Sequence, residues 1–341
     1  DLKDTEASGR VAEALIEVLR QPYTIENREY FLSASIGISH FPNDGEQADD
    51  LLRAADLALY QAKEEGRSTW RMHQPELTRR VEAFVNLEAA LRQALEREEL
   101  CLYYQPKVDA RTRQVIGAEA LIRWEHPEQG LIPPNHFLPL AEEIGLIVEI
   151  GDWVLREACR QGRAWMDAGF DNLRISVNLS GQQIMDPQLV DKVGAALTDS
   201  GCPSGHLQLE ILESFVMRNA EESVRTLSAI RHLGVGLAID DFGSGYSSLA
   251  YLKRLPIDTL KIDQSLVFDI PDDPDDVAIA QAVIALGHSL GLTVCAEGVE
   301  TAAQLQFLVG EGVDEIQGYY FSRPLPTDAF TEYLKGMHSE G

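Results

Sequence analysis

The first apolar positions of the chain recur three to four residues apart, which predicts an amphipathic helix near the start. The residues on this stripe are Val11, Leu15, Val18 and Leu19. Residues 48–65 repeat the pattern and predict a second helix, for which Gly66 is a suitable C-cap. Residues 30–39 lie between these helices and are rich in strand-forming residues around a central glycine. The pattern therefore predicts a small α/β unit over residues 1–73.

A longer helix is predicted next, over residues 76–99, because apolar residues again fall on one stripe and neither proline nor glycine interrupts it. The stripe consists of Phe84, Leu87, Leu91 and Leu95. We interpret residues 74–99 as a helical connector that leads into a second domain.

From residue 100 to residue 341 strand-like runs alternate with helical stretches, which predicts βα units and a parallel sheet. The predicted strands are residues 101–108, 115–124, 173–179, 207–212, 236–241, 259–263, 293–296 and 315–320. Eight such units match the size of a (β/α)₈ barrel. A doubly wound open sheet is the structural alternative.

Polar residues interrupt these apolar strands, and nearly every strand after the first carries one at or near its C-terminal end. They are Glu119, Asn178, Glu210, Asp240, Asp241, Lys261, Asp263, Glu297 and Gln317. Active sites of (β/α)₈ barrels lie at that end of the strands. A single charged residue there is most often solvated or a helix cap, but the repetition favours one shared site.

Converging carboxylates repel one another unless they are protonated or bind cations. Carboxylate and amide oxygens suit Mg²⁺ or Mn²⁺, and Ca²⁺ is a possible occupant that does not support turnover. No histidine joins the set, which argues against zinc. The adjacent pair Asp240–Asp241 has the arrangement expected to bridge two ions in phosphate ester cleavage.

The chain is strongly acidic, with a formal net charge of -26 at pH 7. Such a surface disfavours binding to nucleic acid polymers and to anionic membranes. No run of apolar residues is long enough for a membrane span. If the ligand is a phosphate compound, bound cations have to reverse the local field.

The four cysteines are scattered, without CxxC or zinc-type spacing, which favours a reduced cytoplasmic setting. The chain begins with Asp1 instead of methionine, and its opening reads as the middle of a domain. We expect a piece of a longer protein, whose remaining parts could carry sensors or a membrane anchor.

Several long motifs occur in register and resemble the EAL domain family of cyclic-di-GMP phosphodiesterases. The resemblance covers about residues 78–337 and includes Glu119-Ala120-Leu121, SVNLS, LEILES, AIDDFGSGYSSL, LKIDQS, AEGVE and QGYYFSRPL. It implies hydrolysis of cyclic-di-GMP to the linear dinucleotide pGpG on a (β/α)₈ barrel.

The resemblance also implies roles for individual residues. Glu119, Asn178, Glu210 and Asp240 are expected to bind one ion, and Asp240 with Asp241 a second. Lys261 would orient or deprotonate the attacking water, Glu297 and Gln317 would hold water, and Glu300 would support them. Positions expected near the dinucleotide are Gln105, Leu121, Arg123, Pro139, Asp263, Gln317 and Arg323.

Glu213 resembles the glutamate that supports the loop 241–249, which in this family links the metal site to a dimer interface. Leu212 departs from the threonine that many relatives have before that glutamate. Gly243 and Gly245 would give the loop freedom to move. We therefore expect a homodimer formed through the EAL domain.

Residues 1–73 resemble the second half of a GGDEF domain, but the GGDEF signature loop does not occur in this chain. We expect no cyclase activity from it.

The predicted activity is hydrolysis of one phosphodiester bond with two divalent cations, whose charge would lower the pKa of Lys261. Two alternatives stay open at the level of sequence. One is a receptor that binds cyclic-di-GMP but barely cleaves it, and that uses the ligand to regulate a partner or the dimer state. The other is a scaffold without a ligand, in which each strand-end carboxylate is solvated on its own.

Overall fold

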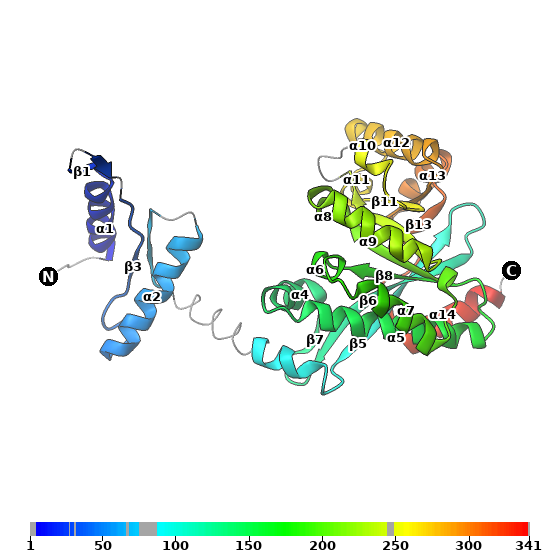
Figure 1. The fold of residues 1–341 in the computed structure, drawn as a ribbon, viewed down its shortest axis with the longest axis horizontal. Coiled ribbons are helices and arrows are strands. Elements are labelled where there is room, and N and C mark those ends of the chain that lie inside the picture. Colours follow the sequence, from blue (N-terminus) through cyan, green and yellow to red (C-terminus); the bar gives the residue numbers. More distant parts are fainter. Residues whose placement is uncertain are drawn as a thin grey trace. The chain divides into compact units, whose positions relative to one another are not determined.

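The structure is a computed structural model, and it describes residues 5–26, 28–30, 32–65, 68–74, 87–243 and 249–339. The chain divides into two compact units, Asp1–Ala90 and Leu91–Gly341 (Figure 1). The predicted cap Gly66, the stripe residue Phe84 and the loop glycine Gly245 lie outside the described residues.

Residues 5–74, as far as the structure describes them, form two helices and four short strands. They are α1 (Thr5–Arg20), β1 (Tyr23–Ile25), β2 (Arg28–Tyr30), β3 (Ile36–Ile38), α2 (Ala48–Glu64) and β4 (Trp70–Met72). Strands β3 and β4 pair in parallel, and α2 lies against them. A Cβ atom at Gly37 would lie 2.0 Å from the carbonyl oxygen of Ala55, so a residue without a side chain is needed where α2 crosses β3.

The two helices predicted in this unit are confirmed, but the apolar stripe of α1 is largely exposed. Val11, Leu15 and Val18 are 48%, 50% and 64% exposed, while Ala12 and Ile16 are buried. The strand predicted for residues 30–39 is shorter than expected, because β2 ends at Tyr30 and β3 covers only Ile36–Ile38.

The predicted helix over residues 76–99 ends early in its described part. Residues 87–94 are helical, and residues 95–98 form turns. Glu98 has a φ of 57°, a left-handed conformation that cannot continue a right-handed helix. Leu91 and Ala94 are fully buried, so the residues from Leu91 onward contribute to the core of the second unit.

The second unit is built on strands β5 to β14, of which β5 and β6 are the longest. The bounds are β5 (Leu100–Asp109), β6 (Val115–His126), β7 (Gly130–Ile132), β8 (Arg174–Leu179), β9 (Leu207–Leu212), β10 (Gly236–Phe242), β11 (Thr259–Ile262), β12 (Thr293–Ala296), β13 (Glu315–Gln317) and β14 (Leu325–Pro326).

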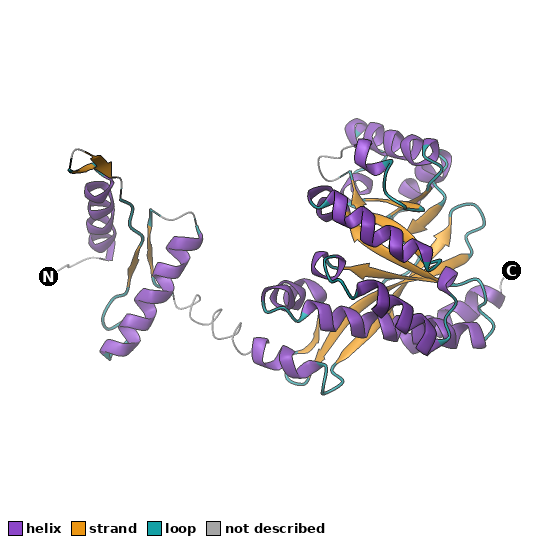
Figure 2. Cartoon of the chain, viewed as in Figure 1, coloured by secondary structure: helices purple, strands orange, loops and turns teal. Residues whose placement is uncertain are grey.

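Helices cover the outside of these strands (Figure 2). Their bounds are α4 (Pro134–Glu143), α5 (Ile147–Asp167), α6 (Gly181–Ile184), α7 (Leu189–Ser200), the 3₁₀ turn η1 (Ser204–His206), α8 (Glu213–Arg218), α9 (Ala220–His232), α10 (Leu249–Leu252), α11 (Ser265–Phe268), α12 (Pro274–Ser289), α13 (Ala302–Gly310) and α14 (Thr327–Ser339).

Eight strands close into a ring in the order β5-β13-β12-β11-β10-β9-β8-β6, because β6 pairs again with β5. The predicted barrel is therefore confirmed, and the open-sheet alternative is wrong. The short strands β7 and β14 add to the outer edges of β6 and β5.

The prediction of an all-parallel sheet is wrong at one strand. Strand β5 runs antiparallel to both of its neighbours, β6 and β13, whereas the other pairs in the ring are parallel. Residues 110–114 are too few for the helical crossover that parallel strands need, so β5 and β6 form a hairpin. Asp109 Oδ1 stabilises the turn by accepting hydrogen bonds from the backbone nitrogens of Arg111 and Thr112.

An aromatic cluster fixes β5 against the surrounding helices. The ring of Trp165 in α5 lies 4.7 Å from that of Tyr104 in β5 and 5.1 Å from that of Phe330 in α14. All three residues are buried, and Trp165 Nε1 also donates a hydrogen bond to Thr331 Oγ1 over 2.9 Å. Because Tyr104 faces outward, strand alternation turns Gln105 toward the barrel interior.

Among the described residues, no helix combines the length and the apolar character that crossing a bilayer requires.

Candidate active site

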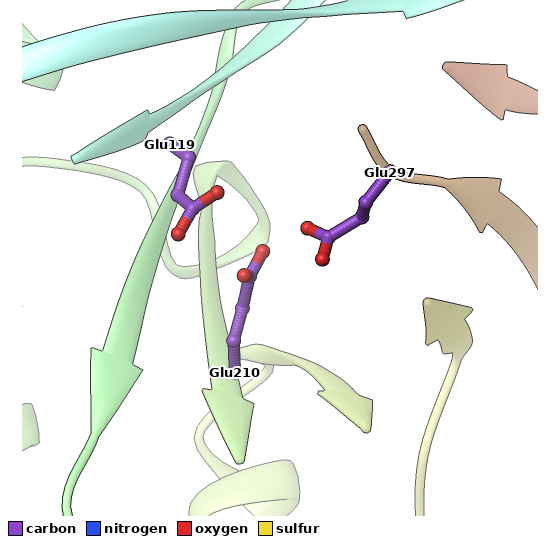
Figure 3. A group of neighbouring side chains, drawn as sticks. All are labelled: Glu119, Glu210 and Glu297. Carbon is purple, nitrogen blue, oxygen red and sulfur yellow. The ribbon is translucent and has the colours of Figure 1, made fainter. Parts of the chain in front are cut away.

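Three glutamates meet at the mouth of the barrel. Glu119 lies in β6, Glu210 in β9 and Glu297 directly after β12. Figure 3 shows the three carboxylates pointing toward a common space. One oxygen of each lies within 4.8 Å of those of the other two, which is close enough for a single ion to bind all three.

A second acidic group forms beside the first, from Asp240, Asp241 and Glu297. Neighbouring residues of a regular strand face opposite ways, but here the pairing of β10 with β11 shifts register between Ile239 and Phe242. Asp241 sits in this bulge with a φ of 54°. Bulges re-aim side chains, and as a result both aspartates line the same cavity.

Lys261 lies among these carboxylates and is fully buried. Its Nζ is 2.6 Å from Glu297 Oε1 and 2.9 Å from Asp240 Oδ1, and it also forms an ion pair with Glu210 Oε2. Burial by itself would lower the pKa of Lys261, but the surrounding carboxylates raise it well above its ordinary value. Without bound cations, the surrounding carboxylates thus keep Lys261 in its charged form. The expectation that bound cations lower the pKa of Lys261 stays a prediction.

Amide side chains from two other strands hold the carboxylate of Glu119. Asn178 donates to Glu119 Oε1 over 2.6 Å, and Gln317 donates to Glu119 Oε2 over 2.5 Å. Gln317 also donates to Gln105 Oε1 over 3.0 Å. Both oxygens of Glu119 are therefore oriented by residues from other strands.

Burial, and after it the crowding of like charges, raises the pKa of several of these carboxyl groups. Burial is the main cause that raises the pKa of Glu119 and of Glu297, and neighbouring carboxylates add to it. Burial, Asp240 and Asp263 together raise the pKa of Asp241 to about 7. Carboxyl groups whose ionised form is destabilised in this way are expected where a cation binds. The carboxylate and amide oxygens present here fit a hard divalent ion.

A buried polar layer below the mouth was not predicted from the sequence. Lys107 of β5 donates to Ser176 Oγ over 2.7 Å and to Gln208 Oε1 over 3.3 Å, and it pairs with Glu210 Oε1. Gln208 in turn donates to Thr259 Oγ1 over 2.9 Å. Lys107 could have been found, because it lies two positions from Gln105 and so shares its face of the strand.

Lys107 and Lys261 both form ion pairs with Glu210 and stabilise its charged form. Burial opposes ionisation of Glu210, but the two ammonium groups outweigh it and lower its pKa to about 2. Glu210 is fully buried, so two adjacent cations are what keeps it ionised.

A cavity of about 190 Å³ opens above these groups. Predicted residues that line it are Gln105, Glu119, Leu121, Asp240, Asp241, Glu297, Glu300 and Gln317. Gln264, Gly298, Gly318 and Tyr319 also line it and were not predicted. The motif QGYY could have indicated Tyr319, because Tyr319 follows Gln317 in the same segment.

Four residues predicted near the dinucleotide lie outside the lining of this cavity. The guanidinium of Arg123 lies 5.5 Å from the ring of Tyr103, and that of Arg323 lies 4.2 Å from the ring of Tyr319. Pro139 is exposed within α4. Asp263 accepts a hydrogen bond from the backbone nitrogen of Ser265 over 2.8 Å.

Glu213, the residue predicted to support the loop 241–249, contacts the chain at the end of β10. Glu213 Oε2 accepts a hydrogen bond from the backbone nitrogen of Gly243 over 3.2 Å. Residues 244–248 lie outside the described part of the chain, so the contact is defined only at the first residues of the loop.

Comparison with known proteins identifies the family. Residues 88–324, more than half of the chain, match the model of the EAL domain. The chain belongs to the EAL domain family. Residues 1–69 match the model described as diguanylate cyclase, GGDEF domain, which agrees with the partial GGDEF unit expected at the N-terminus.

Curated relatives of this EAL protein occur in Pseudomonas aeruginosa. The chain is 48% identical over 318 residues to the bifunctional diguanylate cyclase/cyclic di-GMP phosphodiesterase MucR, covering 93% of this chain and 46% of MucR. It is 44% identical over 335 residues to the cyclic di-GMP phosphodiesterase NbdA, covering 98% of this chain and 43% of NbdA. The chain thus spans less than half the length of these relatives.

A solved structure described as the PaMucR phosphodiesterase in complex with c-di-GMP matches the barrel domain. The TM-score is 0.70 at 52% sequence identity, and the match covers 72% of this chain and 99% of that one. This similarity extends over nearly the whole of the solved domain.

Proposed function

We propose that this chain hydrolyses cyclic-di-GMP to the linear dinucleotide pGpG with the help of two divalent cations. The observation that carries the proposal is the convergence of two acidic groups around Lys261 at one barrel mouth. It is supported by the names of MucR and NbdA as cyclic di-GMP phosphodiesterases and by the c-di-GMP complex of the MucR domain.

The two proposed cations are Mg²⁺ or Mn²⁺ ions. Ca²⁺ is proposed to bind at the same site without supporting turnover. When bound, the cations supply positive charge that neutralises the phosphodiester and activates water. Glu119, Asn178, Glu210 and Asp240 would hold one ion, and Asp241 with Asp240 the other. Residues from four strands share this work, so the barrel presets the ligand geometry before a cation binds.

Lys261 would orient the attacking water with its ammonium group, since its Nζ lies within 3 Å of carboxylates of both acidic groups. Glu297 and Gln317 would hold solvent beside it, and Glu300 would support that arrangement. Gln105 and Leu121 line the cavity, where they would contact the dinucleotide. Arg123 and Arg323 present cations over aromatic rings, an arrangement suited to phosphate or guanine groups.

Chromatography of cyclic-di-GMP incubated with the protein and Mn²⁺ tests this proposal. Appearance of pGpG, and its loss when EDTA is added, is the expected result. Tight binding of cyclic-di-GMP without pGpG would favour the receptor alternative. Absence of both binding and product would overturn the proposed function and favour the scaffold.

Three further predictions belong with this function. We propose that residues 100–341 carry the phosphodiesterase while residues 1–73 form a GGDEF remnant without cyclase activity. We also propose a homodimer through the EAL domain, which analytical ultracentrifugation measures directly. A cytoplasmic setting stays a prediction from the scattered cysteines.

A further inference from the structure

Lys107 and Lys261 divide the two oxygens of Glu210 between them. Lys107 pairs with Oε1, and Lys261 pairs with Oε2. The remaining partners of Lys107 are Ser176 and Gln208, whereas those of Lys261 are carboxylates of the mouth. Oε1 therefore belongs to the buried layer. Oε2 belongs to the mouth, where a bound cation would take the place of the Lys261 ion pair.

The buried layer holds Lys107 firmly in this place. Ser176 Oγ accepts from Lys107 over 2.7 Å and donates to Gln208 Oε1 over 3.0 Å. Lys107, Ser176 and Gln208 are each no more than 2% exposed. Because Lys107 and Glu210 are both buried, separating them would leave two unpaired buried charges, so Lys107 keeps Oε1 occupied.

The number of oxygens that a carboxylate offers matters for the choice of cation. Mg²⁺ requires near-ideal octahedral geometry with short bonds, while Ca²⁺ accepts six to eight oxygens and often takes both oxygens of one carboxylate. A glutamate limited to one oxygen thus favours the smaller ion. A glutamate with two free oxygens favours Ca²⁺.

We infer that Lys107 is a positioning residue that restricts Glu210 to a single ligand oxygen and thereby sets the selectivity of the site for Mg²⁺ over Ca²⁺. This inference rests on the proposed function, because it concerns the same cation site. It adds a residue that contacts neither substrate nor cation and that acts only through Glu210.

Titration calorimetry of the whole chain with MgCl₂ and with CaCl₂ tests the inference without any substrate. In Lys107→Met we expect the ratio of Ca²⁺ affinity to Mg²⁺ affinity to rise about tenfold, the scale typical of outer-shell residues. Loss of the lysine charge affects both divalent ions alike, so the ratio isolates the geometric effect. A purely structural role would weaken both ions together and leave the ratio unchanged.

Two further variants complete the experiment. Ser176→Ala removes one hydroxyl that holds Lys107, so it should shift the ratio in the same direction by a smaller factor, even if Lys107→Met fails to fold. Lys192→Met is the matched control, because Lys192 is also held by two carboxylates, Asp152 at 2.6 Å and Asp186 at 2.8 Å, but lies on α7. It should leave the ratio unchanged.

The outcomes separate the two proposals. If the unaltered protein binds Mg²⁺ and forms pGpG while folded Lys107→Met and Ser176→Ala keep the original ratio, the inference about Lys107 is wrong and the proposed function stands. If the unaltered protein binds neither ion, the cation site itself is wrong and both proposals fall.

Discussion

Gln317 donates a hydrogen bond from its amide to Glu119 Oε2 over 2.5 Å, although 198 positions separate the two residues. Gln317 ends β13 and Glu119 lies in β6, and β5 runs between these strands in the ring. The bond thus spans the antiparallel strand at the closure of the barrel. Orientation of Glu119 depends on that closure, and this makes the pair a sensitive point for mutation.

Replacing Gln317 by leucine removes the donor while keeping the volume of the side chain. We expect the Mn²⁺ concentration for half-maximal activity to rise about 10- to 100-fold, because Glu119 loses one of its orienting partners. Activity titrated with MnCl₂ measures this. Gln306→Leu, on the exposed face of α13, is the control and should behave like the unaltered protein. An unchanged Mn²⁺ requirement in Gln317→Leu would show that the bond does not position Glu119.

Neutralising Glu119 should remove a ligand from the proposed cation site. We expect Glu119→Gln to lower pGpG formation about 100-fold or more, since its amide carries no charge to attract the ion. Glu149→Gln, at an exposed position of α5, should retain full activity. Product chromatography at saturating Mn²⁺ distinguishes them, and equal rates for the two variants would contradict the assignment of Glu119.

Removing the cations should stop the reaction without unfolding the barrel. The two lysines offset part of the carboxylate charge in the metal-free protein, because Lys261 pairs with the mouth carboxylates and Lys107 with Glu210. We therefore expect EDTA to abolish pGpG formation while the circular dichroism spectrum stays that of the folded chain. Activity should return when Mn²⁺ is added in excess. Undiminished turnover in EDTA would refute the two-ion scheme.

Gly318 separates Gln317 from Tyr319, and a side chain there has no room. A Cβ atom would lie 2.1 Å from the carbonyl oxygen of Val299 and 2.4 Å from its nitrogen. Because both are backbone atoms, the segment has to move, and we expect Gly318→Ala to lower activity about 100-fold.

Gly310→Ala is the matched control, since nothing lies within 4 Å of a Cβ atom at that position. Steady-state kinetics of both variants, together with thermal melts, test the steric argument. Normal kinetics in Gly318→Ala would mean that the backbone of Val299 can yield without disturbing Gln317.

Arg174 and Glu315 form an ion pair between β8 and β13, with Arg174 Nη2 at 2.7 Å from Glu315 Oε1. Glu315 is 4% exposed, so Arg174→Met leaves a buried carboxylate without its cation. We expect a loss of about 1–3 kcal/mol in the free energy of unfolding, as for an unsatisfied buried group. Urea denaturation measures it.

Arg160→Met removes an exposed ion pair with Glu157 and should change the free energy of unfolding by less than about 1 kcal/mol. Equal effects of the two substitutions would show that the Arg174–Glu315 pair has no stabilising role of its own.

The sequence by itself determined most helices and strands of the barrel and the polar residues that lie in or directly after its strands. Apolar runs alternating with helical stretches predicted the barrel. These are local properties, because the spacing of side chains along a strand or helix does not depend on the rest of the chain. The motifs indicated the family in the same way, because each motif lies within a short segment of the sequence.

Tertiary structure alone decided the direction of β5, the bulge at Asp241 and the contact of Lys107 with Glu210. Strand direction and register are set by pairing between distant segments, and the local apolar pattern is the same for a parallel and an antiparallel strand. Lys107 therefore looked like an ordinary polar residue in the sequence. Only the closure of the ring buries its ammonium group below the carboxylates and gives it a defined partner.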